Sequence, residues 1–329
     1  MGHLHFGRLD SRTGTVRNAV MNNAAIPLWI THPACTRHEM GMGHPESIAR
    51  LHAIQDRMNA SGLLPMFRQA VAPLAPRAAL VRVHEPRLVD YLLAARPPEG
   101  SYQRIDPDTA LNAHSAEAAQ AAAGAVLLGV DEVLAGKTRF AFCAVRPPGH
   151  HAERRRAMGF CIFNSIAVGA AHALACGLER VAVLDFDVHY GNGTSDIFRD
   201  DPRVLVCNTY QDPYYPGWVS DPARAHIVDA PLKAGDGSAA FRAAVEARWS
   251  SAIDAFKPEL ILVSAGFDAH ASDPLAGLEL SFDDYAWIGG RIREWADAHA
   301  GGRVVASLEG GYDVYALARC VEVFTGGFV

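Results

Sequence analysis

Short apolar runs alternate with amphipathic or alanine-rich segments along most of the chain. Continuous runs of β-branched and aliphatic residues are typical of strands buried on both faces of a parallel sheet. The runs that predict strands are 26–31, 138–145, 181–187, 204–209, 260–264 and 304–308. The segments with helical patterns are 45–61, 77–83, 86–95, 114–134, 163–176, 239–256 and 282–299. The order of strand, loop and helix predicts an α/β fold with a central, mostly parallel β-sheet and helices on both faces.

Residues 26–329 contain no internal repeat, charge block or low-complexity linker, so we expect them to form a single domain. Residues 1–25 are polar and lack a pattern, which predicts a flexible leader. The segment 114–134 is rich in alanine and should form a helix that packs closely against the sheet.

The composition narrows the functional class. Half of the 329 residues are hydrophobic, which is enough for a large core, and the net charge of −6 gives no support for binding to nucleic acid or to an anionic membrane. No apolar run reaches the length of a membrane-spanning helix, and no signal-peptide pattern opens the chain. The six cysteines form no CxxC pair, and several lie in apolar stretches as reduced thiols do. We therefore expect a reducing, cytoplasmic setting.

Chemically reactive side chains follow four of the predicted strands. In α/β sheets, ligands bind outside the carboxyl ends of the strands, so these side chains are expected to meet at one edge. In chain order they are His150 and His151, Asp185 to His189, Asp268, and Tyr312.

Two carboxylates and an imidazole stand at alternate positions in Asp185, Asp187 and His189, so a strand would place them on one side. Buried charges must be paired or bound to a metal. Asp187, His189 and Asp268 form a plausible set for Zn²⁺ with one position left open, although Fe²⁺ or Mn²⁺ would also accept these donors. A water bound to such an ion loses its proton at a pKa that can approach ~7.

The adjacent pair His150 and His151 suggests acid–base chemistry. One of them could take a proton from water and return it to a leaving amine. Each imidazole would need an orienting acceptor, and Asp185 and Asn192 are the candidates.

Three aromatic side chains are further candidates for the site. Tyr312 follows two glycines and could donate a hydrogen bond to a developing oxyanion. Phe160 and Tyr215 lie on predicted loops, where large rings either cap the core or line a pocket.

Together these residues resemble the histone deacetylase and acetylpolyamine amidohydrolase superfamily, which has the arginase-deacetylase fold. The resemblance covers residues 26–329 and is closest to bacterial, class II-like deacetylases. The matching pieces are Arg146-Pro-Pro-Gly-His-His-Ala152, Gly159-Phe-Cys-Ile-Phe-Asn164, Asp185-Phe-Asp-Val-His-Tyr-Gly-Asn-Gly-Thr194, Ser264-Ala-Gly-Phe-Asp268, Asp273-Pro-Leu275 and Glu309-Gly-Gly-Tyr312.

The resemblance implies hydrolysis of an acylated amine by a metal-activated water. It implies one catalytic Zn²⁺ held by Asp187, His189 and Asp268. It also implies a structural K⁺ bound by Asp185 and by the backbone carbonyls of Asp187 and His189. Asp185 is therefore assigned to His150 and to K⁺ rather than to the zinc.

The resemblance implies different catalytic roles for His150 and His151. His151 is the main general base and later the acid, with Asn192 behind it; some members of the family carry Asp at this position. His150 assists and faces Asp185. Tyr312 matches the tyrosine that stabilises the oxyanion.

The resemblance also implies a substrate channel. Phe160 and Tyr215 match its aromatic walls, and Gly159 and Leu275 are expected beside them. Leu275 is neutral where polyamine-selective relatives carry an acidic gate, which favours an acylated lysine peptide. Glu99 lies on a loop that could reach the rim in a homo-oligomer, so an acetylated polyamine stays open as substrate.

Two positions depart from the family pattern. Ser47 stands where an Arg is usual, which leaves the lining of the cavity below the metal uncertain. Tyr210 replaces a frequent His. Neither change touches a metal ligand or the histidine pair.

Two other functional classes remain as alternatives. An arginase-like ureohydrolase with two Mn²⁺ ions would need additional bridging carboxylates near His150 and His151. A non-catalytic module that senses an acylated ligand would keep the fold, but such proteins usually lose at least one ligand or the tyrosine equivalent to Tyr312.

Overall fold

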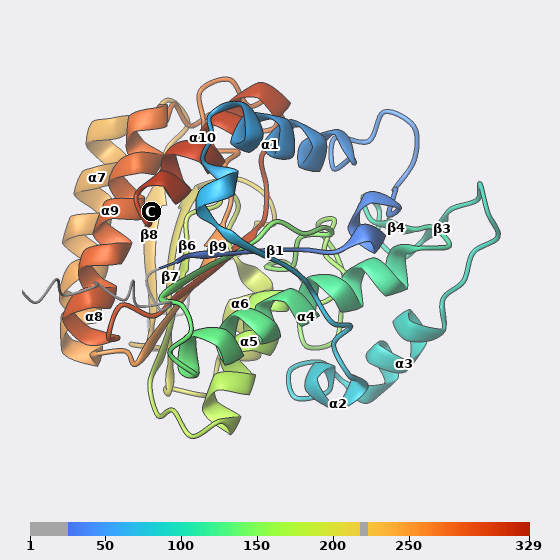
Figure 1. Cartoon of the computed structure of the whole chain (residues 1–329), viewed down its shortest axis with the longest axis horizontal. Coiled ribbons are helices and arrows are strands. Elements are labelled where there is room, and N and C mark those ends of the chain that lie inside the picture. Colours follow the sequence, from blue (N-terminus) through green and yellow to red (C-terminus); the bar gives the residue numbers. More distant parts are fainter. Residues whose placement is uncertain (1–25, 218–222) are drawn as a thin grey trace, which may run out of the picture.

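The computed structural model describes residues 26–217 and 223–329; the predicted leader, residues 1–25, lies outside the described residues. Eight strands form one sheet in the order β2-β1-β5-β10-β9-β6-β7-β8, and every neighbouring pair is parallel. Helices cover both faces of this sheet (Figure 1). The predicted single α/β domain is confirmed.

The strands coincide largely with the apolar runs. Those of the main sheet are β1 (Leu28–Thr31), β2 (Arg68–Val71), β5 (Phe140–Cys143), β6 (Val181–Asp185), β7 (Val204–Gln211), β8 (Ile227–Leu232), β9 (Leu260–Ala265) and β10 (Val304–Leu308). A separate antiparallel pair consists of β3 (Gln103–Arg104) and β4 (Ala110–Leu111).

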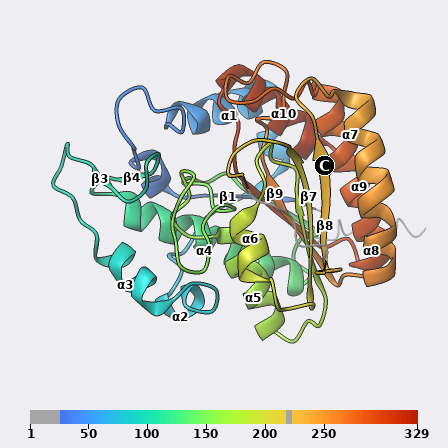
Figure 2. The same cartoon turned by 180° about the vertical axis from the view of Figure 1, so that it is seen from behind.

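The helices fall into two groups, one on each face of the sheet, as the two opposite views show (Figures 1 and 2). The first group is α2 (Arg77–Leu80), α3 (Pro86–Ala94), α4 (Ser115–Leu134), α5 (Ser165–Ala175) and α6 (Asn192–Ile197). The second is α1 (Ala49–Ala60), α7 (Ser238–Val245), α8 (Ser251–Phe256), α9 (Phe282–His299) and α10 (Val314–Gly326). Short 3₁₀ turns lie at Pro33–Thr36 and Leu64–Met66.

Strand β6 shows how the sheet builds two cores at once. Val181 and Val183 join the hydrophobic cluster under the first group of helices, and Ala182 and Leu184 join the cluster under the second. Side chains alternate between the two faces along a strand, so a strand that is buried on both faces is apolar at nearly every position. The continuous apolar run therefore predicts this strand correctly.

The alanine-rich helix α4 packs closely against its neighbours, as its sequence predicts. A Cβ atom at Gly124 would lie 1.8 Å from the Pro73 carbonyl oxygen, and one at Gly129 would lie 2.7 Å from a methyl group of Val305 on β10. Small side chains are what allow the helix to approach the sheet this far.

Several boundaries differ from the prediction. Helix α1 begins at Ala49 rather than at residue 45, because Glu46 turns inward to buried arginines. The helix predicted at 239–256 is interrupted by a π-helical segment, Glu246–Ser250. β2, β3, β4, β8, α6 and α10 were not predicted from sequence; the short edge strands β2 and β8 lack a continuous apolar run. None of the helices in the described residues is long and apolar enough to cross a membrane.

Candidate functional site

Four neighbouring strands bring the reactive side chains to one edge of the sheet. β5, β10, β9 and β6 are adjacent and parallel, so their carboxyl ends meet. The residues that follow them are His150 and His151 after β5, Tyr312 after β10, Asp268 after β9, and Asp187 and His189 after β6. These residues are buried, except for Tyr312, which is partly buried. The fold thus brings together groups that are far apart in the chain.

Asp187, His189 and Asp268 form a buried cluster whose ligand atoms all lie within 4.8 Å of one another. The Nδ1 atom of His189 is 3.0 Å from Oδ1 of Asp187 and 3.2 Å from Oδ2 of Asp268. Strand β6 ends at Asp185, so Asp187 and His189 lie in the turn beyond it rather than on the strand as the alternation suggested.

The cluster fits a divalent metal ion. Oδ2 of Asp268 is buried and contacts only Nδ1 of His189 among possible donors, while its Oδ1 accepts from the Val188 N–H at 2.9 Å. Oδ2 of Asp187 accepts from the Gly310 N–H at 2.8 Å. A buried carboxylate oxygen beside an imidazole and a second carboxylate matches the nitrogen and oxygen donors of catalytic zinc sites. Asp187, His189 and Asp268 would hold the ion.

Glycine is required next to these carboxylates. A Cβ atom at Gly266 would lie 2.1 Å from Oδ2 of Asp187, and one at Gly310 would lie 2.0 Å from Oδ2 of Asp268. The backbone of two loops therefore encloses the carboxylates directly, which holds their orientation.

The charges of the cluster also favour a cation. Burial alone would lower the pKa of His189, but Asp187 and Asp268 raise it to about 10. Burial and the Asp187 carboxylate raise the pKa of Asp268 to about 7. Two carboxylates thus hold a proton on the imidazole, and a bound metal ion would replace that proton.

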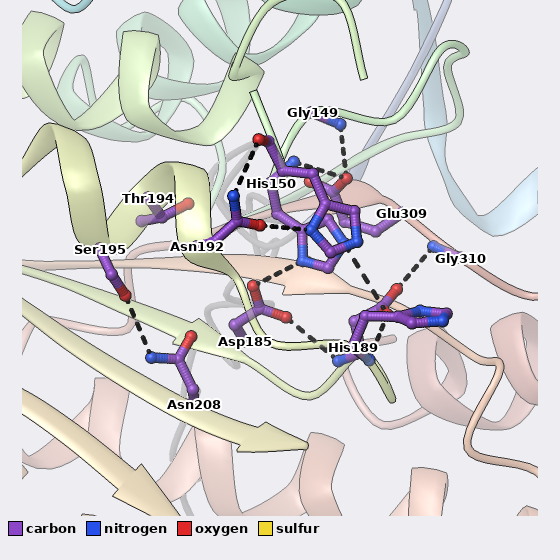
Figure 3. A network of polar contacts seen from close by, with 12 residues as sticks. Gly149, His150, Asp185, His189, Asn192, Thr194, Ser195, Asn208, Glu309 and Gly310 are labelled. Carbon is purple, nitrogen blue, oxygen red and sulfur yellow. Dashed lines mark hydrogen bonds and ion pairs between the residues drawn. The ribbon is translucent and has the colours of Figure 1, made fainter. Parts of the chain in front are cut away.

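The two adjacent histidines have different partners (Figure 3). Nδ1 of His150 is 2.9 Å from Oδ2 of Asp185, and Nδ1 of His151 is 2.6 Å from Oδ1 of Asn192. Burial opposes the charge on both rings. The Asp185 and Asp187 carboxylates nevertheless raise the pKa of His150 well above its usual value, whereas burial and the charge of His150 lower the pKa of His151 well below it. These shifts favour a charged His150 and a neutral His151.

Backbone contacts fix the position of Tyr312. Its N–H donates to Oδ2 of Asp273 at 2.7 Å, and the preceding Gly311 has φ = +123°. The ring stands edge-on to Phe160 with centroids 5.8 Å apart, and the Arg50 guanidinium lies 5.1 Å from its centroid. Burial raises the pKa of the Tyr312 phenol, so it remains a hydrogen-bond donor.

A cavity of about 180 Å³ opens onto these groups. Its lining contains all four residues predicted for the substrate channel, together with three members of the catalytic and metal sets. The lining residues are Asp108, His151, Gly159, Phe160, His189, Tyr214, Tyr215, Leu275 and Tyr312. Asp108 and Tyr214 were not predicted from sequence, because both lie in irregular loops whose contacts come from distant segments.

The wall formed by Gly159 and Phe160 depends on an unusual backbone. Both residues have positive φ, at +58° and +66°. A Cβ atom at Gly159 would lie 2.5 Å from Cδ2 of His151, so only glycine leaves room for the imidazole. Asp108 and Thr109 accept hydrogen bonds from the two backbone N–H groups at 3.2 and 2.9 Å.

Glu309 binds the backbone of the loop that carries His150 (Figure 3). Its Oε2 accepts from the N–H groups of Gly149 and His150 at 2.6 and 3.1 Å, while Oε1 is buried without a partner. Burial raises the pKa of Glu309 to about 7. Its position directly after β10 was the available signal, but no role was assigned to it from sequence.

Asp185 lies beside Asn208, and together their side chains offer oxygen atoms to the K⁺ expected from sequence. Asn208 is its neighbour across β6 and β7, and Oδ1 of Asn208 is buried without a hydrogen-bond partner. A Cβ atom at Gly191 would lie 2.4 Å from Oδ2 of Asp185 and 3.0 Å from Oδ1 of Asn208, so the two oxygens are close together. K⁺ prefers such oxygen ligands. Asn208 was not predicted from sequence as a site residue.

A buried ionic cluster lies behind Tyr312. Glu46 contacts Nη1 of Arg50 at 3.1 Å and Nη2 of Arg146 at 2.7 Å, and all three side chains are fully buried. Arg50 also donates to the carbonyls of Gly311, at 2.7 Å, and of Glu309. The cluster therefore ties the loop after β1 to the loop that carries the tyrosine.

We expect Glu46→Gln to lower the free energy of unfolding by about 3 kcal/mol, because it leaves two buried guanidinium groups without a counter-charge. Burial would raise the pKa of Glu46, but Arg146 and Arg50 lower it from 4.5 to about 2. Its contribution to stability is thus complete above pH 4.5 and is lost as the pH falls towards 2. Urea unfolding at several pH values measures both effects. Glu179→Gln, whose side chain is 82% exposed, is the control; equal stability of the two variants would contradict the prediction.

The two departures from the family pattern lie outside the metal cluster. Ser47 lines an open cavity of about 460 Å³ beside Glu46, formed by the loop after β1 and by Tyr102. Tyr210 is buried and packs edge-on against Tyr190, with centroids 4.8 Å apart.

Comparison with known proteins agrees with this geometry. Residues 44–328 match the model of the histone deacetylase domain. The histone deacetylase-like amidohydrolase of Pseudomonas aeruginosa is 37% identical over 292 residues, which cover 86% of this chain and 75% of that protein. A probable deacetylase of Archaeoglobus fulgidus is 34% identical over 292 residues, covering 87% and 81% of the two chains.

Relatives also occur in plants. Histone deacetylase 14, chloroplastic, of Arabidopsis thaliana is 36% identical over 300 residues, covering 84% of this chain and 71% of that protein. The crystal structure of the HDA15 HD domain superposes with a TM-score of 0.85 at 30% identity, covering 93% of this chain and 89% of that one.

Proposed function

The chain belongs to the histone deacetylase family, and we propose that it is a zinc-dependent amidohydrolase that removes the acyl group from acylated lysine. The observation that carries this proposal is the meeting of three metal donors with His151 and Tyr312. His189 belongs to the buried cluster of two carboxylates and one imidazole, and it lines the same cavity as His151 and Tyr312.

Each residue of the site has its own role in the proposed amide hydrolysis. Zn²⁺ held by Asp187, His189 and Asp268 would polarise the substrate carbonyl and make water more acidic. His151, neutral and with Nδ1 turned to Asn192, offers Nε2 as the base that takes a proton from the attacking water. It returns that proton to the amine nitrogen when the C–N bond breaks, which gives a carboxylic acid and an amine. The second water proton then passes from the acid to the amine, so the products are a carboxylate and an ammonium group.

His150 and Tyr312 stabilise charge around that transfer. The charged His150, paired with Asp185, places a positive group beside the reacting centre. Tyr312 keeps its proton and can donate a hydrogen bond to the oxyanion that forms on the substrate carbonyl.

We expect Tyr312→Phe to lower kcat by about 100-fold, the usual cost of removing one oxyanion donor. KM should change little, because the phenol bonds the oxyanion more strongly than the ground-state carbonyl. Steady-state kinetics on an acetyl-lysine reporter measure both constants. Phe replacement of the exposed Tyr315 is the control. A KM effect without a kcat effect would assign Tyr312 to substrate binding instead.

The channel favours a substrate with a neutral stem. Phe160 and Tyr215 contribute aromatic rings to the lining of the cavity, and Leu275 contributes an aliphatic side chain. The predicted acidic attraction for a polyamine rests on Glu99, which lies 3.3 Å from Nε2 of His114. An acylated lysine side chain fits this lining, and an acetylated polyamine is the alternative substrate.

An arginase-like reaction would need a second set of metal ligands. In the described residues, the other cluster of possible ligands, Asp131, His172 and Cys176, lies at the surface. His150 and His151 direct Nδ1 to Asp185 and Asn192, and neither belongs to a cluster of possible metal ligands in the described residues. These contacts support a single-metal amidohydrolase.

Finer features of the proposal follow from the surrounding residues. All six cysteines are free thiols and five are buried, which supports a reducing, cytoplasmic setting. Asp185 and Asn208 support a K⁺ site near the zinc ligands. A homo-oligomer remains a prediction from sequence.

The proposal is tested by supplying the purified chain with Zn²⁺ and comparing kcat/KM for acetyl-lysine peptides, trifluoroacetyl-lysine peptides and acetylated polyamines. We expect hydrolysis of the lysine peptides with a clear preference over polyamines. The reverse ratio would assign the enzyme to polyamines, and no hydrolysis of any of the three would refute the proposed function.

A further inference from the structure

The oxygen and the nitrogen of the Asn192 amide face different partners. Its Oδ1 faces Nδ1 of His151 at 2.6 Å. On the other side, its Nδ2 donates to Oε1 of Glu153 at 2.8 Å and contacts the His151 carbonyl oxygen at 3.4 Å and Sδ of Met158 at 3.5 Å. An amide nitrogen surrounded by acceptors cannot exchange places with the amide oxygen without losing these bonds.

This orientation decides which nitrogen of His151 carries the proton. Because an amide oxygen only accepts, the Nδ1 atom of His151 must donate, and Nε2 keeps its lone pair for the substrate side. A flipped amide would present N–H to Nδ1 and would favour the opposite tautomer. The contact that holds the amide most firmly is the one with the Glu153 carboxylate, since hydrogen bonds to charged acceptors are the stronger kind.

We propose that Glu153 is a positioning residue for catalysis: it fixes the Asn192 amide, and through it the tautomer of His151. The inference rests on the proposed function, in which His151 is the base. Glu153 reaches neither the cavity lining nor the metal ligands, so it acts only through Asn192. Its carboxylate also polarises the amide, which strengthens the acceptance of the Nδ1 proton.

The loop that carries Glu153 is itself anchored. The Glu153 N–H donates to the Arg156 carbonyl at 2.8 Å, and the Glu153 carbonyl contacts Nδ1 of His84 at 2.9 Å. The Arg154 N–H donates to Asp196 at 3.0 Å on the same α6 helix that contains Asn192. The carboxylate therefore meets Asn192 from a fixed backbone rather than from a flexible surface loop.

The contact also explains why position 192 carries an amide rather than a carboxylate. Asp at 192 would place an oxygen where Nδ2 now lies 2.8 Å from Oε1 of Glu153. Two carboxylates at that distance repel each other, and one of them must move away or take up a proton. Glu153 and Asn192 thus form a matched pair, in which changing one member changes what the other tolerates.

A double-mutant cycle tests this pairing. We compare the wild type with Glu153→Gln, Asn192→Asp and the double variant on the acetyl-lysine reporter. We expect Glu153→Gln to lower kcat by less than about 10-fold, because Gln still offers an oxygen to Nδ2. Asn192→Asp should lower kcat by about 100-fold, because repulsion from Glu153 moves the new carboxylate out of its place beside Nδ1 of His151. The double variant should regain about 10-fold over Asn192→Asp, since a Gln amide can donate to the new carboxylate. KM and zinc content should stay close to those of the wild type in all four proteins.

Thermal unfolding of the same four proteins gives a readout that does not require activity. Asn192→Asp should lower Tm by a few degrees when Glu153 is present and by less when residue 153 is Gln. Glu179→Gln, an exposed Glu→Gln change, is the control. Additive effects in both kcat and Tm would overturn the inference. If the wild type hydrolyses none of the acylated substrates, the proposed function fails, and the Tm cycle alone decides whether the two side chains are coupled.

Discussion

Replacement of Asp268 by Asn is expected to remove zinc from the protein and to lower kcat/KM by on the order of 1,000-fold or more, several kcal/mol of transition-state stabilisation. Asp268 would supply the carboxylate that comes from a different strand than the other two proposed ligands, and its buried Oδ2 contacts Nδ1 of His189 at 3.2 Å. An amide in this place offers a neutral oxygen, and it removes the charge that a divalent ion needs for balance. Zinc content after dialysis and kcat/KM on the same sample measure both effects.

The control is Asp297→Asn, the same change at an exposed position on α9. The fold should survive the replacement of Asp268, because burial and Asp187 already raise its pKa to about 7, and a neutral side chain relieves this repulsion. We therefore expect a Tm near that of the metal-free wild type. A variant that keeps a full equivalent of zinc would show that Asp268 is not a ligand.

Replacement of His151 by Ala is expected to lower kcat by about 1,000-fold while the zinc content stays near that of the wild type. His151 lines the cavity, its Nδ1 is engaged by Asn192, and burial together with the neighbouring His150 keeps it neutral. Without it, the attacking water has no base and the leaving amine has no acid. kcat, KM and metal content are measured on one preparation.

His52→Ala, at an exposed position on α1, is the control for this change. His150→Ala should also lose activity, by removing the charged partner of Asp185. Loss of zinc from the His151 variant would mark His151 as a ligand. Nearly unchanged kcat would assign the base to another residue.

The fold could be predicted from sequence wherever a strand is buried on both faces. β6 and β9 begin as continuous apolar runs, residues 181–184 and 260–263, because each of these positions contacts one of the two cores. The reactive residues could be placed at one edge, because parallel strands all end there. β8 was missed because this edge strand contains Asp229 and Pro231, and no local pattern distinguishes it from a loop.

The supporting residues could not be predicted for a different reason. Glu46 and Arg146 are 100 positions apart, and Glu309 lies 160 positions from Gly149. Their contacts depend on how loops from different strands pack together, which periodicity does not record. Glu153 stands close to His151 in the chain, but its role depends on the orientation of the Asn192 amide, which only the structure shows.

The proposed amidohydrolase activity depends on one metal ion held by Asp187, His189 and Asp268. The most direct test strips the protein with a chelator and titrates it with Zn²⁺ while following hydrolysis of an acetyl-lysine peptide. Activity should be lost on stripping, rise linearly with added zinc and level off at one equivalent per chain. Full activity in the stripped protein, or a requirement for two equivalents, would contradict the account.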